Sequence, residues 1–375
     1  MASDIVSKSK PPEGEKTLTA QCHCKSVRFT VTVLSSSLPL ATHLCHCHIC
    51  RYGHGTLCCF HAPLPSEIAP QFIAPSSLTS SCTGYQHAQS ASERFFCKTC
   101  GCHIGDVDLI PDPQIGVPEW RIATSIFSSH DDFQIRSHVF TASHHGPSLS
   151  DWLPLPIWNP APADPTFPIP HPPPPPREFD PAGHERLRAE CHCGGVSFTL
   201  PRPTHPALAD NKTIARYVSK TDPNKWVACL DVCDDCRLTS GAHVVGWTFV
   251  PLASLEPRVP EGFGFGTLVS YASSEGVLRA FCGVCGATVF YSSEDPLRVG
   301  EVGREETMVD VAVGILRSAE GPAAEDWVTW RTGRVAFLGD GVGFDRGFAE
   351  ALDQGFKAWA VERHGEVLEF NIPLL

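Results

Sequence analysis

The chain has 375 residues, 42% of them apolar, and a formal net charge of −12 at pH 7, so it is long enough for two domains of ordinary size. Its acidic charge and the lack of a Lys/Arg stripe argue against nucleic acid or an anionic membrane as a partner. The sequence contains neither an apolar run of about eighteen residues nor an apolar core within residues 1–10, so we expect no membrane span and no signal peptide.

The first half of the chain predicts a β-strand over 27–33, where β-branched residues alternate with others. It also carries three ordered cysteine motifs, namely Cys22-x-Cys24, Cys45-x-Cys47-x-x-Cys50 and Cys97-x-x-Cys100. Thiolates this close in sequence can converge on one soft cation, of which zinc is the usual one. Seven positions make one closed four-ligand site and one three-ligand site with an open position. A structural zinc takes the closed kind, and a catalytic zinc takes the open kind.

Other residues of the first half have plainer interpretations. We expect Cys58, Cys59 and Cys102 to pack in the core, and Cys82, which lies in a Ser-rich turn, to be exposed. Arg51 directly follows the middle motif. An arginine there can pair with a substrate carboxylate or balance the charge of a thiolate-rich site, and the sequence leaves both alternatives open.

A proline-rich segment over 154–181 forms the most visible boundary in the chain. Its run of five prolines at 172–176 favours polyproline II and cannot form a helix or a central strand, so the segment acts as a semi-rigid spacer. We expect a first domain over 17–157, a Pro-rich linker over 158–186 and a second domain over 187–375.

The second half repeats the motifs of the first as Cys191-x-Cys193, Asp231-x-Cys233-x-x-Cys236 and Cys282-x-x-Cys285. Short strands are predicted over 244–250, 278–281 and 288–291. The order and spacing indicate duplication of a whole domain, with an insertion of about seventeen residues around 203–225.

The middle motif of the second half has Asp231 where the first half has Cys45. A carboxylate can ligate zinc, but an Asp-Cys-Cys set is harder and binds zinc more weakly than three thiolates. Two alternatives stay open: this set holds a metal, or the second domain is degenerate and kept for packing. Cys229 is near enough to replace Asp231 as a ligand, although burial in the core is the favoured interpretation.

A helix is predicted near the C-terminus, because five apolar residues recur there at helical spacing: Phe344, Phe348, Leu352, Phe356 and Trp359. Two glycines, Gly347 and Gly355, lower the helix propensity. We expect this helix to pack on the second domain rather than to bind a partner.

Both halves resemble the glutathione-dependent formaldehyde-activating enzyme family, which includes the centromere protein V group, over about 20–155 and 188–340. The resemblance rests on the three ordered motifs and, in the first half, on Arg51 and His138-Val139-Phe140-Thr141. It implies a mainly β fold of two tandem Mss4-like zinc-binding domains, followed by the C-terminal helix. It also implies that the outer motifs form closed structural zinc sites, at Cys22, Cys24, Cys97 and Cys100 and again at Cys191, Cys193, Cys282 and Cys285.

The resemblance further implies that Cys45, Cys47 and Cys50 form an open, catalytic Zn²⁺ site. The leading hypothesis is a cytoplasmic, zinc-dependent carbon–sulfur lyase or thiol-adduct enzyme similar to S-(hydroxymethyl)glutathione synthase. Its substrate would be a small thiol or thioether such as a glutathione adduct, because zinc lowers the pKa of a bound thiol. The first domain is the expected active site, since it alone keeps three middle thiolates. A weaker metal site is expected at Asp231, Cys233 and Cys236.

The alternative, from another class of function, is a non-catalytic, zinc-stabilised tandem scaffold that binds a protein partner. Tandem domains joined by a proline spacer suit such a role. Retention of all seven cysteines in the first domain argues for more than a scaffold, because structure alone needs only the closed site. The tight cysteine clusters and the missing signal favour reduced, metal-bound thiolates over disulfides.

Overall fold

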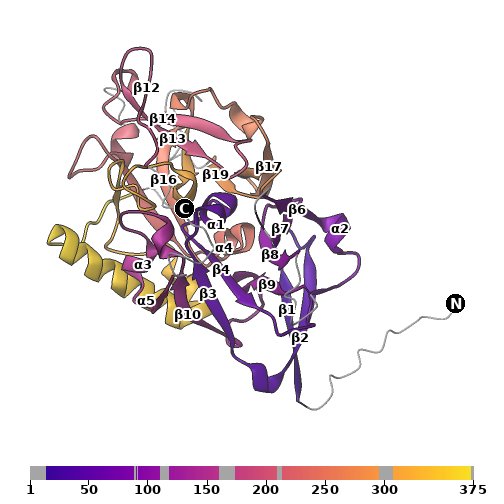
Figure 1. Ribbon diagram of the computed structural model, residues 1–375. Helices are drawn as coiled ribbons and strands as arrows, with labels where there is room; N and C mark the ends of the chain where they lie inside the picture. Colours follow the sequence, from indigo (N-terminus) through magenta and orange to yellow (C-terminus); the bar gives the residue numbers. More distant parts are fainter. Residues whose placement is uncertain are drawn as a thin grey trace.

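The computed structural model describes residues 14–87, 90, 92–109, 118–159, 174–208, 213–294 and 307–372. These residues form four β-sheets with short helices between strands and one long helix near the C-terminus (Figure 1). The prediction of a mainly β chain with a C-terminal helix is therefore confirmed, and the arrangement is consistent with an Mss4-like fold. Part of the predicted proline-rich linker, residues 160–173, lies outside the described residues.

Two sheets come from the first half of the chain. The small sheet has the order β1–β2–β5, and the large sheet has the order β11–β10–β3–β4–β9–β8–β7–β6. The strands are β1 (Glu15–Gln21), β2 (Arg28–Leu34), β3 (Leu40–Cys45), β4 (Cys59–Pro63), β5 (Gln71–Phe72), β6 (Cys82–Gln86), β7 (Ser92–Cys97), β8 (His103–Asp108), β9 (Trp120–Ala123), β10 (Phe133–Val139) and β11 (Ile157–Trp158). The helices are α1 (His48–His54), α2 (Leu78–Ser81) and α3 (Leu149–Trp152).

Two more sheets come from the second half. The small sheet has the order β12–β13–β14, and the large sheet has the order β17–β18–β19–β20–β16–β15–β21. The strands are β12 (Glu178–Phe179), β13 (Glu185–Glu190), β14 (Ser197–Pro201), β15 (Trp226–Asp231), β16 (Val245–Pro251), β17 (Leu268–Ser274), β18 (Val277–Cys282), β19 (Thr288–Ser293), β20 (Met308–Ala312) and β21 (Val328–Trp330). The helices are α4 (Asp234–Ser240) and α5 (Leu338–His364).

The two large sheets have the same strand order. The series β6–β7–β8–β9–β4–β3–β10 in the first half corresponds to β17–β18–β19–β20–β16–β15–β21 in the second, and β10 and β21 each pair in parallel with their neighbour. A short helix, α1 or α4, follows the equivalent strand β3 or β15. This correspondence supports the predicted duplication, while the domain boundaries stay a prediction.

Alternation of apolar and polar residues explains the small sheet of the first half. In β2, Phe29, Val31 and Val33 are buried, and the residues between them are more exposed. A strand with one face on the core and one toward solvent has this period of two. The large sheet of the second half differs, since every residue of β16 is buried. Because such a strand is covered on both faces, its sequence reads as a continuous apolar run.

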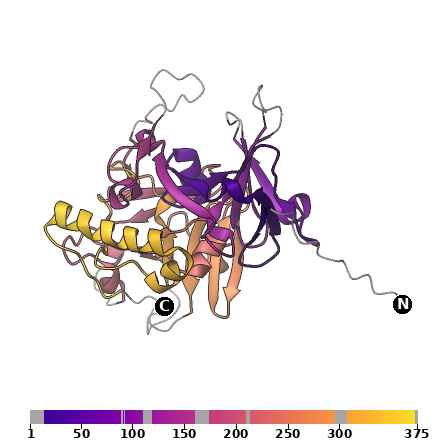
Figure 2. The same ribbon diagram turned by 90° about the horizontal axis from the view of Figure 1, so that it is seen from below.

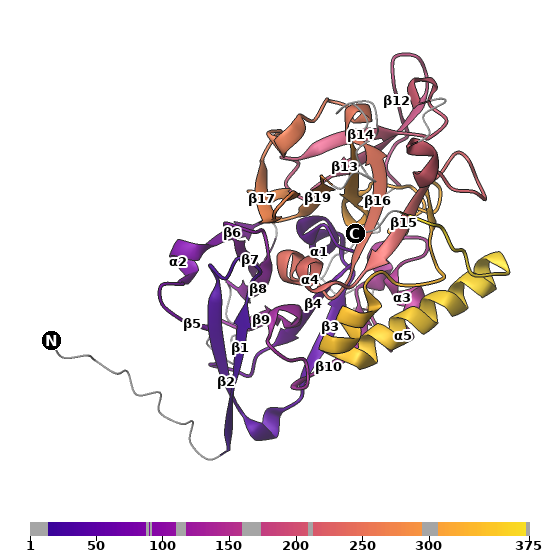
Figure 3. The same cartoon turned by 180° about the vertical axis from the view of Figure 1, so that it is seen from behind.

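The two halves meet around α1 and α4, which lie next to each other at the centre of the molecule (Figures 1 and 3). The contacts there are reciprocal. The amide of His23 donates to the carbonyl of Leu238 in α4 (3.0 Å), and the amide of His192 donates to the carbonyl of Tyr52 in α1 (3.1 Å). The short helix of each half thus holds the loop that carries the first outer cysteine pair of the other half.

Close backbone contact at this junction requires glycine. Gly55, after α1, has a φ of +73°, and a Cβ there would lie 2.0 Å from the carbonyl oxygen of Thr288. Gly241, after α4, has a φ of +77°, and its Cβ would lie 2.3 Å from the carbonyl oxygen of His103. These equivalent glycines end the two helices in the left-handed conformation and let the halves approach.

The long helix α5 lies along one side of the molecule (Figure 2). It packs on both halves, whereas the sequence predicted contact with the second only. Phe356 lies 4.8 Å from the ring of Trp152 in α3 and 6.0 Å from that of Trp330 in β21. Gly355 permits this contact, because a Cβ there would lie 2.0 Å from the carbonyl oxygen of Trp152.

Among the helices that the structure describes, none combines the length and the apolar character that crossing a membrane requires.

The junction between the halves yields a stability prediction. We expect Gly55→Ala to lower the midpoint of thermal unfolding well below that of Gly183→Ala. Both positions have positive φ, which costs a non-glycine residue about 1–2 kcal/mol, but the Cβ at Gly183 would meet open space. The measurement is thermal unfolding of the full chain followed by circular dichroism. Equal midpoints for the two variants would show that the close contact between Gly55 and Thr288 does not support the fold.

Candidate metal centres

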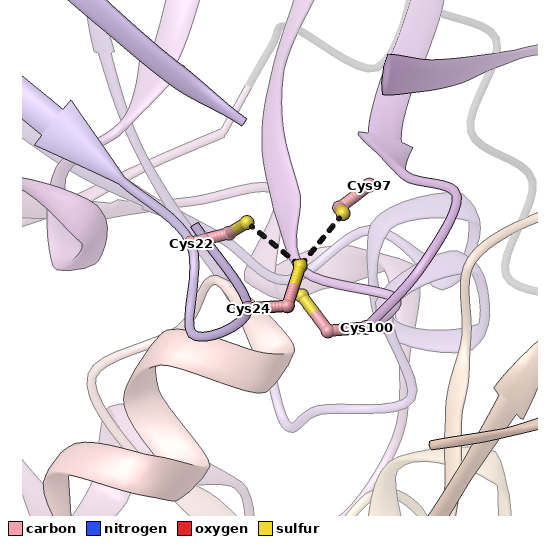
Figure 4. Close-up of side chains that lie close together, drawn as sticks. All are labelled: Cys22, Cys24, Cys97 and Cys100. Atoms are coloured by element: carbon pink, nitrogen blue, oxygen red, sulfur yellow. Dashed lines mark hydrogen bonds between the residues drawn. The ribbon is translucent and has the colours of Figure 1, made fainter. Parts of the chain in front are cut away.

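The outer cysteines of the first half converge as the sequence predicted (Figure 4). Cys22 and Cys24 lie in the turn between β1 and β2, Cys97 ends β7, and Cys100 lies in the turn between β7 and β8. The Sγ atom of Cys24 is 3.5 Å from those of Cys22 and Cys97. All four sulfurs lie within 4.8 Å of one another and can hold a metal ion.

The outer cysteines of the second half form the same arrangement. Cys191 and Cys193 lie between β13 and β14, Cys282 ends β18, and Cys285 lies between β18 and β19. The Sγ atom of Cys193 is 3.5 Å from that of Cys191 and 3.4 Å from that of Cys282. This second group of four sulfurs also fits within 4.8 Å.

Backbone amides support the sulfurs in both outer clusters. The amide of Val27 donates to Cys22 Sγ (3.4 Å), and the equivalent amide of Val196 donates to Cys191 Sγ (3.3 Å). Hydrogen bonding by neighbouring thiols, that of Cys100 first, lowers the pKa of Cys24 far below its usual value. Each donation favours a thiolate, which is the form that ligates metals.

The middle cysteines of the first half also come together. Cys45 ends β3, Cys47 caps the N-terminus of α1, and Cys50 lies in its first turn, where its amide donates to Cys47 Sγ (3.4 Å). The thiol of Cys45, followed by that of Cys47, lowers the pKa of Cys50 well below its usual value. Hydrogen bonding within the trio therefore favours the thiolate form of Cys50.

Cys59 joins this middle cluster, which the sequence analysis missed. It is buried, as predicted, but it is the direct partner of Cys45 in the pairing of β3 with β4, and its ligand atom lies within 4.8 Å of those of Cys45 and Cys50. Cys58 stays in the hydrophobic core. Cys58 lies just before β4, whereas Cys59 is the strand residue that pairs with Cys45. This pairing distinguishes the two cysteines, and the sequence alone does not show it. The exposure predicted for Cys82 is wrong, since it is buried.

The middle motif of the second half has the same backbone. Asp231 ends β15, Cys233 caps α4, and the amide of Cys236 donates to Cys233 Sγ (3.2 Å). One carboxylate oxygen of Asp231 accepts from the amide of Cys233 (2.8 Å), and burial raises the pKa of Asp231. Cys229 is fully buried in the hydrophobic core, as the sequence predicted.

A cavity of about 420 Å³ opens onto this second middle motif. Asp231, Cys233 and Cys236 form part of its wall, together with Arg279 and the aromatic ring of Tyr291. The rest of the wall combines an apolar part with four further carboxylates, those of Asp234, Asp235, Asp310 and Asp340. The sequence analysis placed the active site in the first half, so this cavity beside the diverged motif was not anticipated.

The sequence analysis selected Arg51, and Arg237 has the equivalent position directly after Cys236. Arg237 pairs with Asp234 (2.6 Å) and lies over the ring of Phe344. Arg51 donates to the hydroxyl of Tyr52. Arg279 instead donates to Cys236 Sγ (3.4 Å).

Arg94 is the counterpart of Arg279 in the first half. Burial acts to lower the pKa of Arg94, but the nearby charges of Cys50 and Asp106 outweigh it and raise that pKa. Both arginines stand three positions before an outer Cys-x-x-Cys pair. That repeated position is the sequence signal that could have identified them.

His138, which is part of the family resemblance, contacts the first middle motif through His46. Its Nε2 donates to the carbonyl of Leu153 (2.8 Å), so its Nδ1 accepts from His46 Nε2 (2.8 Å). His46 stands between Cys45 and Cys47 in the sequence. Both ring nitrogens of His138 are therefore occupied, and its role in this arrangement is to hold His46 in place.

The outer clusters yield a prediction about metal content and folding. We expect Cys97→Ser or Cys282→Ser to lose one metal ion per chain and to lower the thermal unfolding midpoint sharply, because binding at a four-thiolate site contributes on the order of 10 kcal/mol to folding. Elemental analysis and thermal melts measure both effects. Cys102→Ala is the control, since Cys102 is buried beside the same cluster but is not one of its four members. Full metal content in Cys97→Ser would contradict the assignment.

Residues 17–143 match the family of the glutathione-dependent formaldehyde-activating enzyme. A search of curated proteins found no match to the chain. The matched region contains the outer cluster and the middle motif of the first half, which are the residues on which the resemblance rested. The tandem organisation stays a prediction. The first half of the chain therefore carries a domain of the glutathione-dependent formaldehyde-activating enzyme family.

Proposed function

We propose that the chain is a zinc-dependent carbon–sulfur lyase or thiol-adduct enzyme similar to S-(hydroxymethyl)glutathione synthase, and that it acts at Cys45, Cys47 and Cys50. The family match supports a glutathione-related formaldehyde-activating function. The observation that carries the proposal is the sulfur trio inside the matched domain, where Cys45 and Cys47 are only partly buried.

The donor sets fit zinc. Four sulfurs around Zn²⁺, with Zn–S bonds of about 2.3 Å, lie about 3.8 Å apart, and neighbouring sulfurs in the outer clusters lie 3.4–3.5 Å apart. Thiolate-rich sites select soft or borderline cations over Mg²⁺ or Ca²⁺. We therefore propose structural zinc in each outer cluster and zinc at the first middle motif.

Within the first half, each residue has a defined task. Bound zinc would supply a Lewis acid that stabilises a substrate thiolate or polarises an aldehyde oxygen. The cysteine trio would hold the ion, and His46, which stands between Cys45 and Cys47, is fixed by its hydrogen bond to His138. Arg94 beside Cys50 offsets the negative charge of the sulfurs.

The proposed reaction balances without a redox partner. In the direction of synthesis a C–S bond forms between the substrate sulfur and the aldehyde carbon, and the thiol proton ends on the former carbonyl oxygen. In the direction of cleavage the hydroxyl loses its proton, the C=O bond re-forms as the C–S bond breaks, and the departing thiolate takes up a proton. A site that favours the thiolate lowers the barrier in both directions, because the thiolate is both nucleophile and leaving group.

A second candidate site for this chemistry is the 420 Å³ cavity of the second half. Arg279 donates to Cys236 Sγ and lies over the ring of Tyr291 at the cavity wall, where Asp235 also pairs with it (3.9 Å). The replacement of one thiolate by Asp231 is the argument against it, because a harder donor set holds zinc more weakly. We propose the cavity as a ligand-binding site whose metal is less firmly held.

The assignment to the first half is tested by paired alanine variants. We expect Cys47→Ala to reduce turnover of a thiol–aldehyde adduct by roughly two orders of magnitude or more, since loss of a ligand costs more than loss of its supporting partner. Cys233→Ala, its equivalent in the second half, should have a much smaller effect. Circular dichroism verifies that both proteins fold.

The other outcomes of this assay separate the alternatives. Loss of activity in Cys233→Ala alone would move the active site to the cavity of the second half. Equal losses would mean that the two halves act as one site. A folded wild-type protein that binds zinc but turns over no adduct would favour the tandem scaffold.

The role of Asp231 is tested by a graded series. We expect the second middle motif to hold zinc most firmly in Asp231→Cys, less firmly in the wild type and least in Asp231→Asn. The order follows from the donors, since a thiolate binds zinc better than a carboxylate and a carboxylate better than a neutral amide. The measurement is the zinc retained per chain against a chelator of increasing concentration. Identical retention in all three proteins would show that position 231 supplies no ligand.

A further inference from the structure

Three metal-ligating side chains meet beside the first middle motif, where no zinc motif of the sequence places them. His54 ends α1, and Cys59 and His61 lie on the same face of β4. One ligand atom from each lies within 4.8 Å of the others. All three residues are buried, with His54 completely covered.

The hydrogen bonds of the two imidazoles leave one bare nitrogen on each. His54 Nδ1 lies 2.9 Å from the carbonyl oxygen of Cys50, which can only accept, so Nδ1 carries the proton and Nε2 carries a lone pair. His61 Nδ1 lies 2.8 Å from a carboxylate oxygen of Asp106 and donates to it in the same way. Neither Nε2 has a hydrogen-bond partner among the described residues.

An unpartnered, buried polar nitrogen is costly and uncommon. Here two occur together, next to a thiol. Histidines that bind metals almost always donate their other ring N–H to a carboxylate or a backbone carbonyl, which fixes the tautomer and aims the bare nitrogen at the ion. Cys50 supplies such a carbonyl for His54. Asp106, itself held by Arg121 (2.6 Å), supplies such a carboxylate for His61.

The second half lacks all three side chains. Gly55 and Gly241 end the equivalent helices, so His54 corresponds to Ser240. Pairing of Cys45 with Cys59 corresponds to pairing of Asp231 with Val245, so Cys59 corresponds to Val245 and His61 to Trp247. The second large sheet forms with these residues in place, which shows that packing of this fold does not require the histidines and the thiol.

We propose that His54, Cys59 and His61 bind a metal ion, in the first place Zn²⁺, next to the ion of the first middle motif. A set of two imidazoles and one thiolate suits a borderline-soft cation and leaves a fourth position open. The ligand atom of Cys59 also lies within 4.8 Å of those of Cys45 and Cys50. Its thiolate is therefore placed to bridge the two ions, so the first half would hold a pair of metals beside its closed outer site.

Metal counting tests the proposal on the full chain. We expect His54→Ser combined with His61→Phe to contain one metal ion fewer per chain than the wild type after reconstitution with Zn²⁺ and removal of free metal. The matched control is His103→Phe, because His103 stacks on His54 (3.8 Å between ring centroids) but is not one of the three proposed ligands. The control should keep the wild-type count. An unchanged count in the double variant overturns the proposal.

A measurement on the unmodified protein covers the case in which the double variant fails to fold. After exchange with ¹¹³Cd²⁺, the wild-type chain should give a resonance for mixed nitrogen and sulfur ligation, apart from the resonances of all-thiolate sites. A spectrum with all-thiolate resonances alone overturns the proposal. Neither experiment depends on catalysis, so a failed lyase assay with a retained mixed-ligand ion would refute the proposed function and leave this site standing.

Discussion

The two sheets of each half are joined where four thiols meet in a turn-to-turn contact. Two of these thiols come from the turn of the small sheet and two from the turn between two strands of the large sheet. Four neighbouring sulfurs away from water are unfavourable unless they share protons or a cation, because each thiolate repels the next. A shared cation would turn this repulsion into attraction and hold the turns of the two sheets together. The middle motif depends on that contact, since it lies at the end of a large-sheet strand.

The halves depend on each other through the same turns. His23 lies between two outer cysteines of the first half in the sequence, and its Nδ1 forms a hydrogen bond with the hydroxyl of Tyr271 in the second half (2.7 Å). His192 occupies the equivalent position in the second half and meets the hydroxyl of Tyr85 in the first (2.7 Å). The loop that would bind a structural ion in one half is therefore part of the surface that the other half packs against. Loss of an ion in one half is expected to loosen this shared surface as well.

Local spacing accounts for what the sequence could predict. Residues two or three positions apart, such as Cys22 and Cys24, must lie near one another, so each cysteine pair and the repeat of the motifs were visible without a structure. The grouping of two outer pairs into one cluster came from the family resemblance. Contacts that depend on strand pairing were not visible. Cys59 joins Cys45 only because β3 and β4 pair in one register. The contact between His54 and His61 was not visible either, because it depends on how α1 packs against β4. The contact of α5 with the first half was missed as well, because an apolar stripe shows which face is buried and not what covers it.

The reciprocal contacts between the halves are those expected where two copies of one chain meet across a twofold axis, except that here a single polypeptide supplies both sides. In a symmetric homodimer each substitution appears twice, so a change that improves one site alters both. Fusion removes this constraint. Asp231 and Val245 can stand in one half beside Cys45 and Cys59 in the other, because each half carries its own residue at the equivalent position. Covalent linkage also keeps the local concentration of each half independent of how much protein the cell makes, so the pair persists at expression levels at which a weak dimer would separate.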